Sequence, residues 1–257
     1  MRSASAPSLR LPRRAALQGM ALACWLGAWA ARAEPAPALI RAVRADGGLQ
    51  LDDGRLVRLA GIDMGEEQGQ VAAASRAKLE QLAAGKSAVL NATVEGEDRH
   101  GRLLAHVAVG GVWLQGALLE AGLARVRTDL DSRARAEEML ALERLARQRG
   151  IGLWAERRFA IVAADQAERA IGRFALVEGR VLKAAEIRGR VYLNFGEDWR
   201  RDFTILFEAP AAKLARRAGW EPRSLEGKRI RARGLVRSFN GPLIEATHPE
   251  QIEKLEV

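Results

Sequence analysis

The stretch V-R-L-A-G-I-D-M-G-E, from Val57 to Glu66, decides the fold and carries the first chemical signal. Its first half places an arginine between apolar residues, which is typical of a strand with one buried face. Its second half places two carboxylates, Asp63 and Glu66, beyond the end of that strand. Further along the chain, D-R-H-G-R (Asp98 to Arg102) indicates a turn into another strand. The two segments together place arginines and carboxylates beside predicted strands.

Arg58 and Arg102 are the cations of this set. A guanidinium presents a planar fork of donors that stays charged at any working pH. Two such forks suit a phosphodiester, because they can hold the phosphate and stabilise the charge that develops when water attacks it. The alternative is a pair of ordinary surface or ion-pair arginines, since arginine is common in this sequence.

The same motifs resemble the active-site signature of the staphylococcal nuclease (thermonuclease) family, over about residues 39–158. The resemblance includes A-G-L-A-R-V (Ala121 to Val126) and E-x-x-A-R-x-x-x-x-G-L-W (Glu143 to Trp154). It implies a five-stranded barrel close to an OB-fold and hydrolysis of nucleic-acid phosphodiesters. It also implies that Arg58 and Arg102 are catalytic and that Glu66 is the general base.

The resemblance further implies a Ca²⁺ site, formed by Asp63 and the backbone carbonyl of Met64. The family's second carboxylate falls on Gly48, because its D-G-D-T is D-G-G-L here. Asp46 is a partial substitute, expected roughly 6–7 Å along the strand from the missing group. A site with fewer charged ligands binds Ca²⁺ more weakly, so another divalent metal or none stays open. Asp63 is equally explained as a cap of the strand end.

Other departures keep a second hypothesis open. Gly65 stands where the family has proline, and Arg127-Thr128-Asp129 occupy the region of its substrate-contacting tyrosines. The first hypothesis is metal-assisted attack of water on DNA or RNA. The second is a catalytically degenerate module that binds nucleic acid or another partner without turnover.

Residues 1–33 have the features of a secretory signal peptide: arginines, then an apolar run, then Ala31-Arg32-Ala33. We predict cleavage before Glu34, by the Sec or twin-arginine route, and a periplasmic or secreted protein without stable membrane insertion. Cys24 is the only cysteine and lies in this segment, so the mature chain has no disulfide. Residues 171–257 hold 17 basic and 12 acidic residues, which favours attraction to a polyanion.

The remaining pattern predicts a mainly β protein with helices, built from two tandem OB-fold-like five-stranded barrels. Asp52-Asp53-Gly54 and Asn240-Gly241 are hairpin turns. The predicted domains are residues 34–158 and 171–257, joined by an alanine-rich linker at 159–170. The expected helices are Val71–Leu82, Val112–Glu120, Ser132–Arg149 and Pro210–Ala218, and the expected strands of the second barrel are Phe174–Val181, Arg190–Phe195, Asp202–Phe207, Lys228–Arg237 and Leu243–Thr247.

The second barrel offers a candidate surface for single-stranded DNA or RNA. Aromatic rings stack on bases while arginines neutralise phosphates. The candidates are Tyr192, Trp199, Arg229, Arg231 and Arg233. The alternative is that the aromatic residues belong to the core and the arginines only face solvent. A third hypothesis is that the sheet binds an oligosaccharide or a protein.

Overall fold

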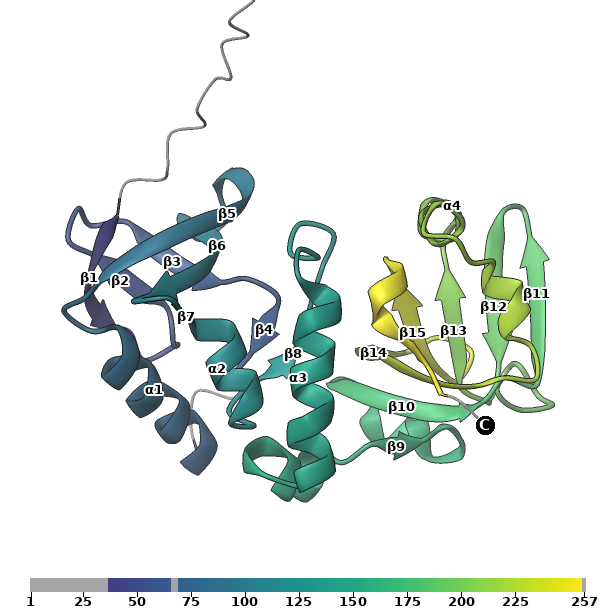
Figure 1. The fold of residues 1–257 in the computed structure, drawn as a ribbon. Coiled ribbons are helices and arrows are strands. Elements are labelled where there is room, and N and C mark those ends of the chain that lie inside the picture. Colours follow the sequence, from purple (N-terminus) through teal and green to yellow (C-terminus); the bar gives the residue numbers. More distant parts are fainter. Residues whose placement is uncertain (1–36, 66–68, 256–257) are drawn as a thin grey trace, which may run out of the picture. The chain divides into compact units, whose positions relative to one another are not determined.

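The structure is a computed structural model, and it describes residues 37–65 and 69–255 of the 257-residue chain (Figure 1). The predicted signal peptide and Glu66 lie outside the described residues. The described residues belong to one compact unit. Within them, no helix has the length and apolar character needed to cross a membrane.

Five strands close into the first barrel, as predicted. They are β1 (Ala38–Val43), β2 (Leu49–Leu51), β3 (Leu56–Leu59), β5 (Ser87–Glu97) and β6 (Arg102–Val109). The sheet runs β3-β2-β1-β5-β6, and a parallel pairing of β3 with β6 completes the ring. A short strand, β7 (Val112–Trp113), pairs antiparallel with the end of β6. This closure brings the two arginine motifs together, because Arg58 lies on β3 and Arg102 begins β6.

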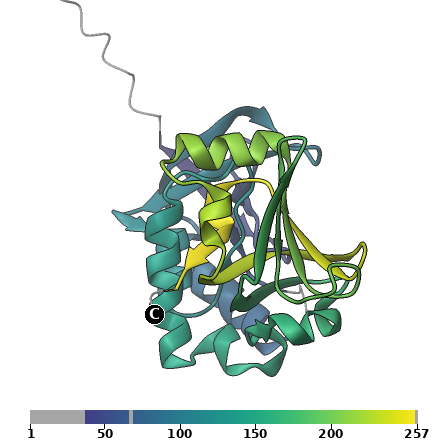
Figure 2. The same ribbon diagram turned by 90° about the vertical axis from the view of Figure 1, so that its right-hand side faces the viewer.

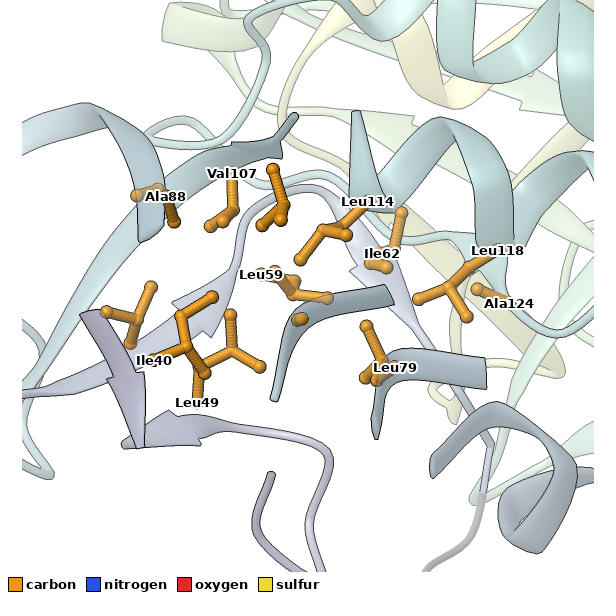
Figure 3. Close-up of a cluster of buried hydrophobic side chains, with 14 of the residues drawn as sticks. Ile40, Leu49, Leu59, Ile62, Leu79, Ala88, Val107, Leu114, Leu118 and Ala124 are labelled. Atoms are coloured by element: carbon orange, nitrogen blue, oxygen red, sulfur yellow. The ribbon is translucent and has the colours of Figure 1, made fainter. Parts of the chain in front are cut away.

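Side chains at alternate positions along the strands point inward and fill the barrel. Val57 and Leu59 are buried while Arg58 between them is half-buried, as expected for a strand with one inward face. The inward side chains meet those of α1 (Gln70–Ala83) and α2 (Leu114–Glu120), which supply Leu79, Leu114 and Leu118 (Figure 3). The helix predicted at 71–82 is confirmed. The helix predicted from Ser132 begins later, as α3 (Ala136–Arg149).

The strand that carries Arg58 ends at Leu59, before the chain reaches Asp63. Gly61 has a φ of 74°, a left-handed conformation that glycine adopts readily, and the chain turns there. The next residues form a separate strand, β4 (Ile62–Asp63), which pairs with β8 (Arg125–Val126). The turn therefore carries Asp63 away from the barrel strand and sets it opposite Arg125.

The second barrel is built on a curled sheet in the order β11-β12-β13-β15-β14-β10-β9 (Figure 2). Its strands are β9 (Val162–Ala163), β10 (Phe174–Arg180), β11 (Lys183–Ile187), β12 (Arg190–Asn194), β13 (Thr204–Phe207), β14 (Arg229–Ser238), β15 (Pro242–Ala246) and β16 (Ile252–Lys254). Helix α4 (Ala209–Arg217) follows β13. As in the first barrel, the third and last strands of the ring, β13 and β15, pair in parallel. Strand β11 was not predicted; it follows β10 after a two-residue bend.

Residues 159–170, predicted as a linker, contain regular secondary structure. Strand β9 pairs with β10, and a 3-10 helix (Ala164–Ala170) follows it. Ala167 and Ala170 are buried in the core of the second barrel. An alanine-rich segment can form a linker, but the small side chain of alanine also permits close packing. Other 3-10 turns are Gly152–Ala155, Arg157–Phe159, Pro222–Leu225 and Pro249–Gln251.

A buried ionic cluster joins β14 to α3 and β16. Arg233 is 1% exposed. Its guanidinium donates to Glu143 Oε2 at 2.6 Å and to Glu253 Oε1 at 2.5 Å. Arg147 also donates to Glu253, at 2.9 Å. Glu143 belongs to the last helix of the first barrel region, so this cluster ties the two halves of the compact unit together.

Candidate active site

The first barrel carries a small pocket of about 110 Å³ that gathers most of the predicted site residues. The lining includes Asp46, Gly48, Arg58, Asp63, Met64, Gly65, Arg102 and Arg127. They come from the β1–β2 turn, β3, the end of β4, the start of β6 and the segment after β8. Leu56 pairs with Arg102 across β3 and β6, and Arg58 is on the same face of β3 as Leu56. The parallel register therefore places both arginines on one side of the sheet.

Arg102 is held in place by the turn that precedes it. Its Nε and Nη2 donate to Asp98 Oδ2 at 3.0 and 2.9 Å, and Nη1 lies 3.5 Å from Asp46 Oδ2. Partial burial raises the pKa of Asp98, but hydrogen bonds from Arg102 and from the His100 and Arg102 backbones outweigh it and lower that pKa to about 2. Asp98 is therefore ionised and orients the guanidinium. The sequence showed Asp98 in the motif, but we assigned it no role.

Arg58 is half-buried on the pocket wall. Among the residues that the structure describes, its guanidinium forms no hydrogen bond or ion pair. Its donors are available to an anion in the pocket. Glu66, the predicted base, follows Gly65 of the pocket lining in the sequence but lies outside the described residues.

Asp63 is paired with arginine. Its Oδ2 accepts from Arg125 Nε at 3.0 Å and Nη2 at 2.8 Å, and Arg127 Nη1 lies 3.7 Å away. Its Oδ1 accepts from the backbone N–H of Gly65 at 3.0 Å. The carboxylate thus caps the strand end and forms an ion pair. In the sequence, Arg125 stands out only as part of the A-G-L-A-R-V motif. Nothing in that motif predicts that β8 pairs with β4.

Asp46 lies closer to the vacant carboxylate position than predicted. A Cβ placed on Gly48 would stand 3.1 Å from Asp46 Oδ1, and the Gly48 backbone N–H donates to the same oxygen at 3.0 Å. The expected displacement of roughly 6–7 Å along a strand is wrong, because residues 45–48 form a turn rather than extended strand. The Asp46 carboxylate therefore occupies the space beside Gly48.

The described residues do not fit Ca²⁺ as they stand. Ca²⁺ takes six to eight oxygen ligands, with carboxylates free to coordinate it. Here Asp63 faces Arg125 and Asp46 faces Arg102 and Arg44. Met64, predicted to offer its carbonyl, packs its side chain against Gly47. Across residues 37–65 and 69–255, no three acidic, histidine or cysteine side chains are grouped to hold a metal.

Gly65 also distinguishes this pocket. Its φ is 81°, in the left-handed region, whereas proline is fixed near −65°. A proline could not adopt this backbone conformation. A Cβ on Gly65 would also stand 3.2 Å from Cζ of Phe159. The segment that leads to Glu66 therefore follows a path that depends on glycine.

On the second barrel, the predicted nucleic-acid residues separate into two groups. Tyr192 and Trp199 line a common hollow. The arginines of β14 do not lie there. Arg233 is buried in the ionic cluster, Arg231 pairs with Glu178 and Glu253, and Arg229 pairs with Glu178.

The prediction that Arg233 faces solvent is wrong, because this side chain is buried. The same prediction is wrong for Arg231, which is largely buried and paired with two carboxylates. Strand alternation was correct, but this face of β14 is turned toward Glu143 of α3, and the neighbouring strand β16 adds Glu253. Of the three candidate arginines, Arg229 alone is exposed.

Comparison with known proteins places this pocket in context. Residues 56–156 match the sequence pattern of the family described as Staphylococcal nuclease homologue. The Staphylococcal-like nuclease CAN1 of Arabidopsis thaliana is 34% identical over 99 residues. That match covers 38% of this chain and 29% of the relative, so this chain spans less than a third of the relative's length. The matched region contains Arg58, Asp63 and Arg102, and the likeness supports a nuclease-like function.

Proposed function

We propose that this chain, whose residues 56–156 form a staphylococcal nuclease-like domain, binds a nucleic-acid phosphodiester in the first-barrel pocket and hydrolyses it. One observation carries the proposal: the pocket unites Arg58 and Arg102 with the segment that leads directly to Glu66. Arginines from two strands enter one small pocket, and one of them has no partner within the described residues.

The arginines would bind the non-bridging oxygens of the phosphate. Arg102 is oriented by Asp98 before substrate arrives. The fork of Arg58 has no partner among the described residues. Preorganised donors of this kind stabilise the extra negative charge of the five-coordinate transition state. Glu66 would accept a proton from water as the water oxygen bonds to phosphorus. The bond from phosphorus to one ester oxygen then breaks, and that oxygen takes up a proton.

The family resemblance also implies Ca²⁺, but the described carboxylates do not fit that ion as arranged. The proposed steps therefore involve only the arginines, Asp98 and Glu66.

A second function is favoured by the pairing of Asp63 with Arg125 and Arg127. This pairing neutralises the carboxylate that the resemblance assigns to a metal. If it persists with substrate bound, the pocket remains a cationic phosphate site, and the domain binds nucleic acid without turnover.

A cleavage assay on the full chain separates the two functions. Single-stranded DNA and RNA are incubated with the protein in chelator, Ca²⁺, Mg²⁺ and Mn²⁺, beside Glu66→Gln, Arg102→Ala and the control Arg99→Ala. Arg99 lies in the same turn as Arg102 but not in the pocket lining.

Hydrolysis predicts that Glu66→Gln and Arg102→Ala each lose at least about 100-fold in rate, while Arg99→Ala is unchanged. Retained oligonucleotide binding with no cleavage in any of these conditions would support the binding function. Equal cleavage by all variants would mean that the reacting groups lie elsewhere.

We also propose that residues 1–33 direct export to the periplasm or the medium. Sequencing the amino terminus of the protein recovered outside the cytoplasm tests this, with Glu34 expected as the first residue. Recovery of the unprocessed chain in the cytoplasm alone would contradict it.

A further inference from the structure

The second barrel carries a larger hollow, of about 420 Å³, on its outer surface. Its floor is a row of side chains that crosses four strands. Lys183 pairs with Asn194, Asn194 with Thr204, and Thr204 with Leu243. The volume lies within the range of sites that bind small organic groups. The hollow is thus built on a rigid sheet rather than on a loop alone.

Aromatic side chains surround this floor. Trp199 is 51% exposed and Phe239 is 65% exposed, and both line the hollow with Tyr192. Tyr192 is outside the barrel because its neighbours Val191 and Leu193 point into the core.

Other aromatic residues of this barrel pack against one another near the core. The Phe195 and Phe203 rings are 4.9 Å apart, and those of Phe207 and Trp220 are 5.9 Å apart. The barrel therefore has a second, solvent-facing aromatic set. Exposed rings of this size around a hollow are typical of a binding surface.

The polar groups of the hollow favour a ligand with hydrogen-bonding edges. Asn194 Oδ1 accepts from the Thr204 hydroxyl at 3.1 Å, which directs the remaining hydrogen-bonding capacity of its amide to the hollow. Asn240 adds a second amide in the β14–β15 turn, and Glu197 adds an acceptor. Rings that stack and amides that read an edge together match a nucleobase.

Basic residues beside the hollow favour a phosphate backbone over an uncharged sugar chain. Lys183 lines the hollow and is exposed, and the Arg200 guanidinium lies 4.9 Å from the Trp199 ring. Arg200 is exposed, and within the described part of the chain its side chain forms no ion pair.

We propose that this hollow binds bases of single-stranded nucleic acid, by stacking on Trp199, Phe239 and Tyr192. Duplex DNA is excluded, because its bases are already stacked and cannot reach the rings. The ligand identity rests on the proposed function, since the first barrel would cleave the strand that the second barrel holds. The hollow includes Tyr192 and Trp199 of the surface predicted from the sequence but none of its three β14 arginines.

Binding to the full chain tests the proposal. The probe is fluorescein-labelled oligo(dT) of about twelve nucleotides, within the range that one OB fold binds. Trp199→Ala and Phe239→Ala are compared with Trp199→Phe, which keeps a ring, and with Leu235→Ala, an exposed residue outside the hollow.

Each alanine variant at the hollow should weaken binding about 5- to 150-fold, as expected for the loss of one stacked base. Trp199→Phe should restore most of the affinity, and Leu235→Ala should bind like the unchanged protein. Unchanged affinity in both alanine variants would overturn the proposal, and so would equal binding of a duplex of the same length.

Two further arms separate this proposal from the nuclease proposal. Cleavage of a dinucleotide should be unaffected by Trp199→Ala, because the hollow and the first-barrel pocket share no lining residue. Arg102→Ala should lose cleavage but keep oligo(dT) binding. A neutral oligosaccharide that competes with oligo(dT) at equal concentration would identify a sugar site and overturn the assignment.

Discussion

Arg102 illustrates how one side chain becomes a preorganised phosphate ligand. Two of its nitrogens donate to Asp98, and a third lies near Asp46. A free arginine loses rotamer entropy when it binds a phosphate, but here Asp98 already restricts the side chain. The cost is partial neutralisation of the guanidinium, which Arg58 offsets by remaining unpaired among the described residues.

Asp98→Asn should therefore lower activity without unfolding the chain. The amide offers one acceptor and no charge, so Arg102 loses its fixed orientation. We expect kcat/KM to fall by about 10- to 100-fold, the effect of a misplaced catalytic group. Steady-state kinetics measure it, with circular dichroism as the check of fold. Wild-type kinetics in this variant would show that Asp98 does not position Arg102.

Gly48→Asp should strengthen Ca²⁺ binding at the first-barrel pocket. Gly48 has no left-handed φ, and a Cβ there needs only a small shift of Asp46 Oδ1 at 3.1 Å. The two neighbouring carboxylates repel each other until a cation joins them.

Thermal unfolding measures this effect. At Ca²⁺ about ten times its Kd, the variant should gain roughly 1.4 kcal/mol, and the Gly48→Asn control should gain nothing. If both variants respond to Ca²⁺ alike, the carboxylate at position 48 is not the missing ligand.

The elements around the pocket show what could be predicted from the sequence. Helix α1 and the strands of the first ring follow from apolar periodicity and turn residues, which are local signals. The β4–β8 pairing joins residues more than sixty positions apart, and each of the two strands is only two residues long. No local pattern encodes such a pairing, so the Asp63–Arg125 ion pair could not be foreseen.

The second barrel shows the same limit. Alternation in β14 correctly separated Arg231 and Arg233 from the barrel core, but it could not show that Glu143 of α3 lies against that face or that the neighbouring strand β16 adds Glu253 beside it. Likewise, the sequence left Trp199 and Phe239 compatible with core positions, but the structure places them in the turns before β13 and after β14, where both line one hollow.

Gly65→Ala tests the backbone path between β4 and Glu66. Alanine at a φ of 81° costs about 1–2 kcal/mol, and its Cβ would press on Phe159 Cζ at 3.2 Å. Urea unfolding should show a loss of that size, together with lower activity. Gly48→Ala, without a left-handed φ, is the matched control and should lose less. Equal losses in the two variants would argue against backbone strain as the cause.

The buried ionic cluster should make the two halves unfold together. Removing one partner leaves buried carboxylates unpaired, so Arg233→Ala should cost about 3–5 kcal/mol in urea unfolding. Arg237→Ala is the control, since its pair with Glu245 is exposed and should contribute at most about 1 kcal/mol. A small loss of unfolding free energy in Arg233→Ala would mean that water hydrogen-bonds to the carboxylates that Arg233 leaves unpaired.

Stability should decrease as the solution becomes acidic, in two steps. Burial lowers the pKa of His248 from 6.5 to about 4, so the unfolded chain binds a proton first and stability falls between those values. Burial raises the pKa of Glu253, but Arg233, Arg147 and Arg231 outweigh it and lower that pKa to about 2. Its contribution is complete above pH 4.5 and is lost as pH falls toward 2.

Unfolding free energies measured across this range should show both steps. His248→Gln should flatten the first step and leave the second intact. A pH profile identical to that of the unchanged protein would remove His248 as its cause.

The buried ionic cluster around Arg233 also affects how the chain folds while it is being synthesised. Glu143 is made long before Glu253, and the first barrel is complete in sequence when α3 leaves the ribosome. Its Oε2 carboxylate oxygen then lacks the Arg233 donor that neutralises it in the finished protein. Ala136 and Met139 already pack α3 into the core of the first barrel, so we expect the Glu143 side of this helix to stay exposed to water until β14 and β16 are made. The last strands made thus complete the burial of the first half, and a chain stopped before residue 233 would remain an unstable target for proteases.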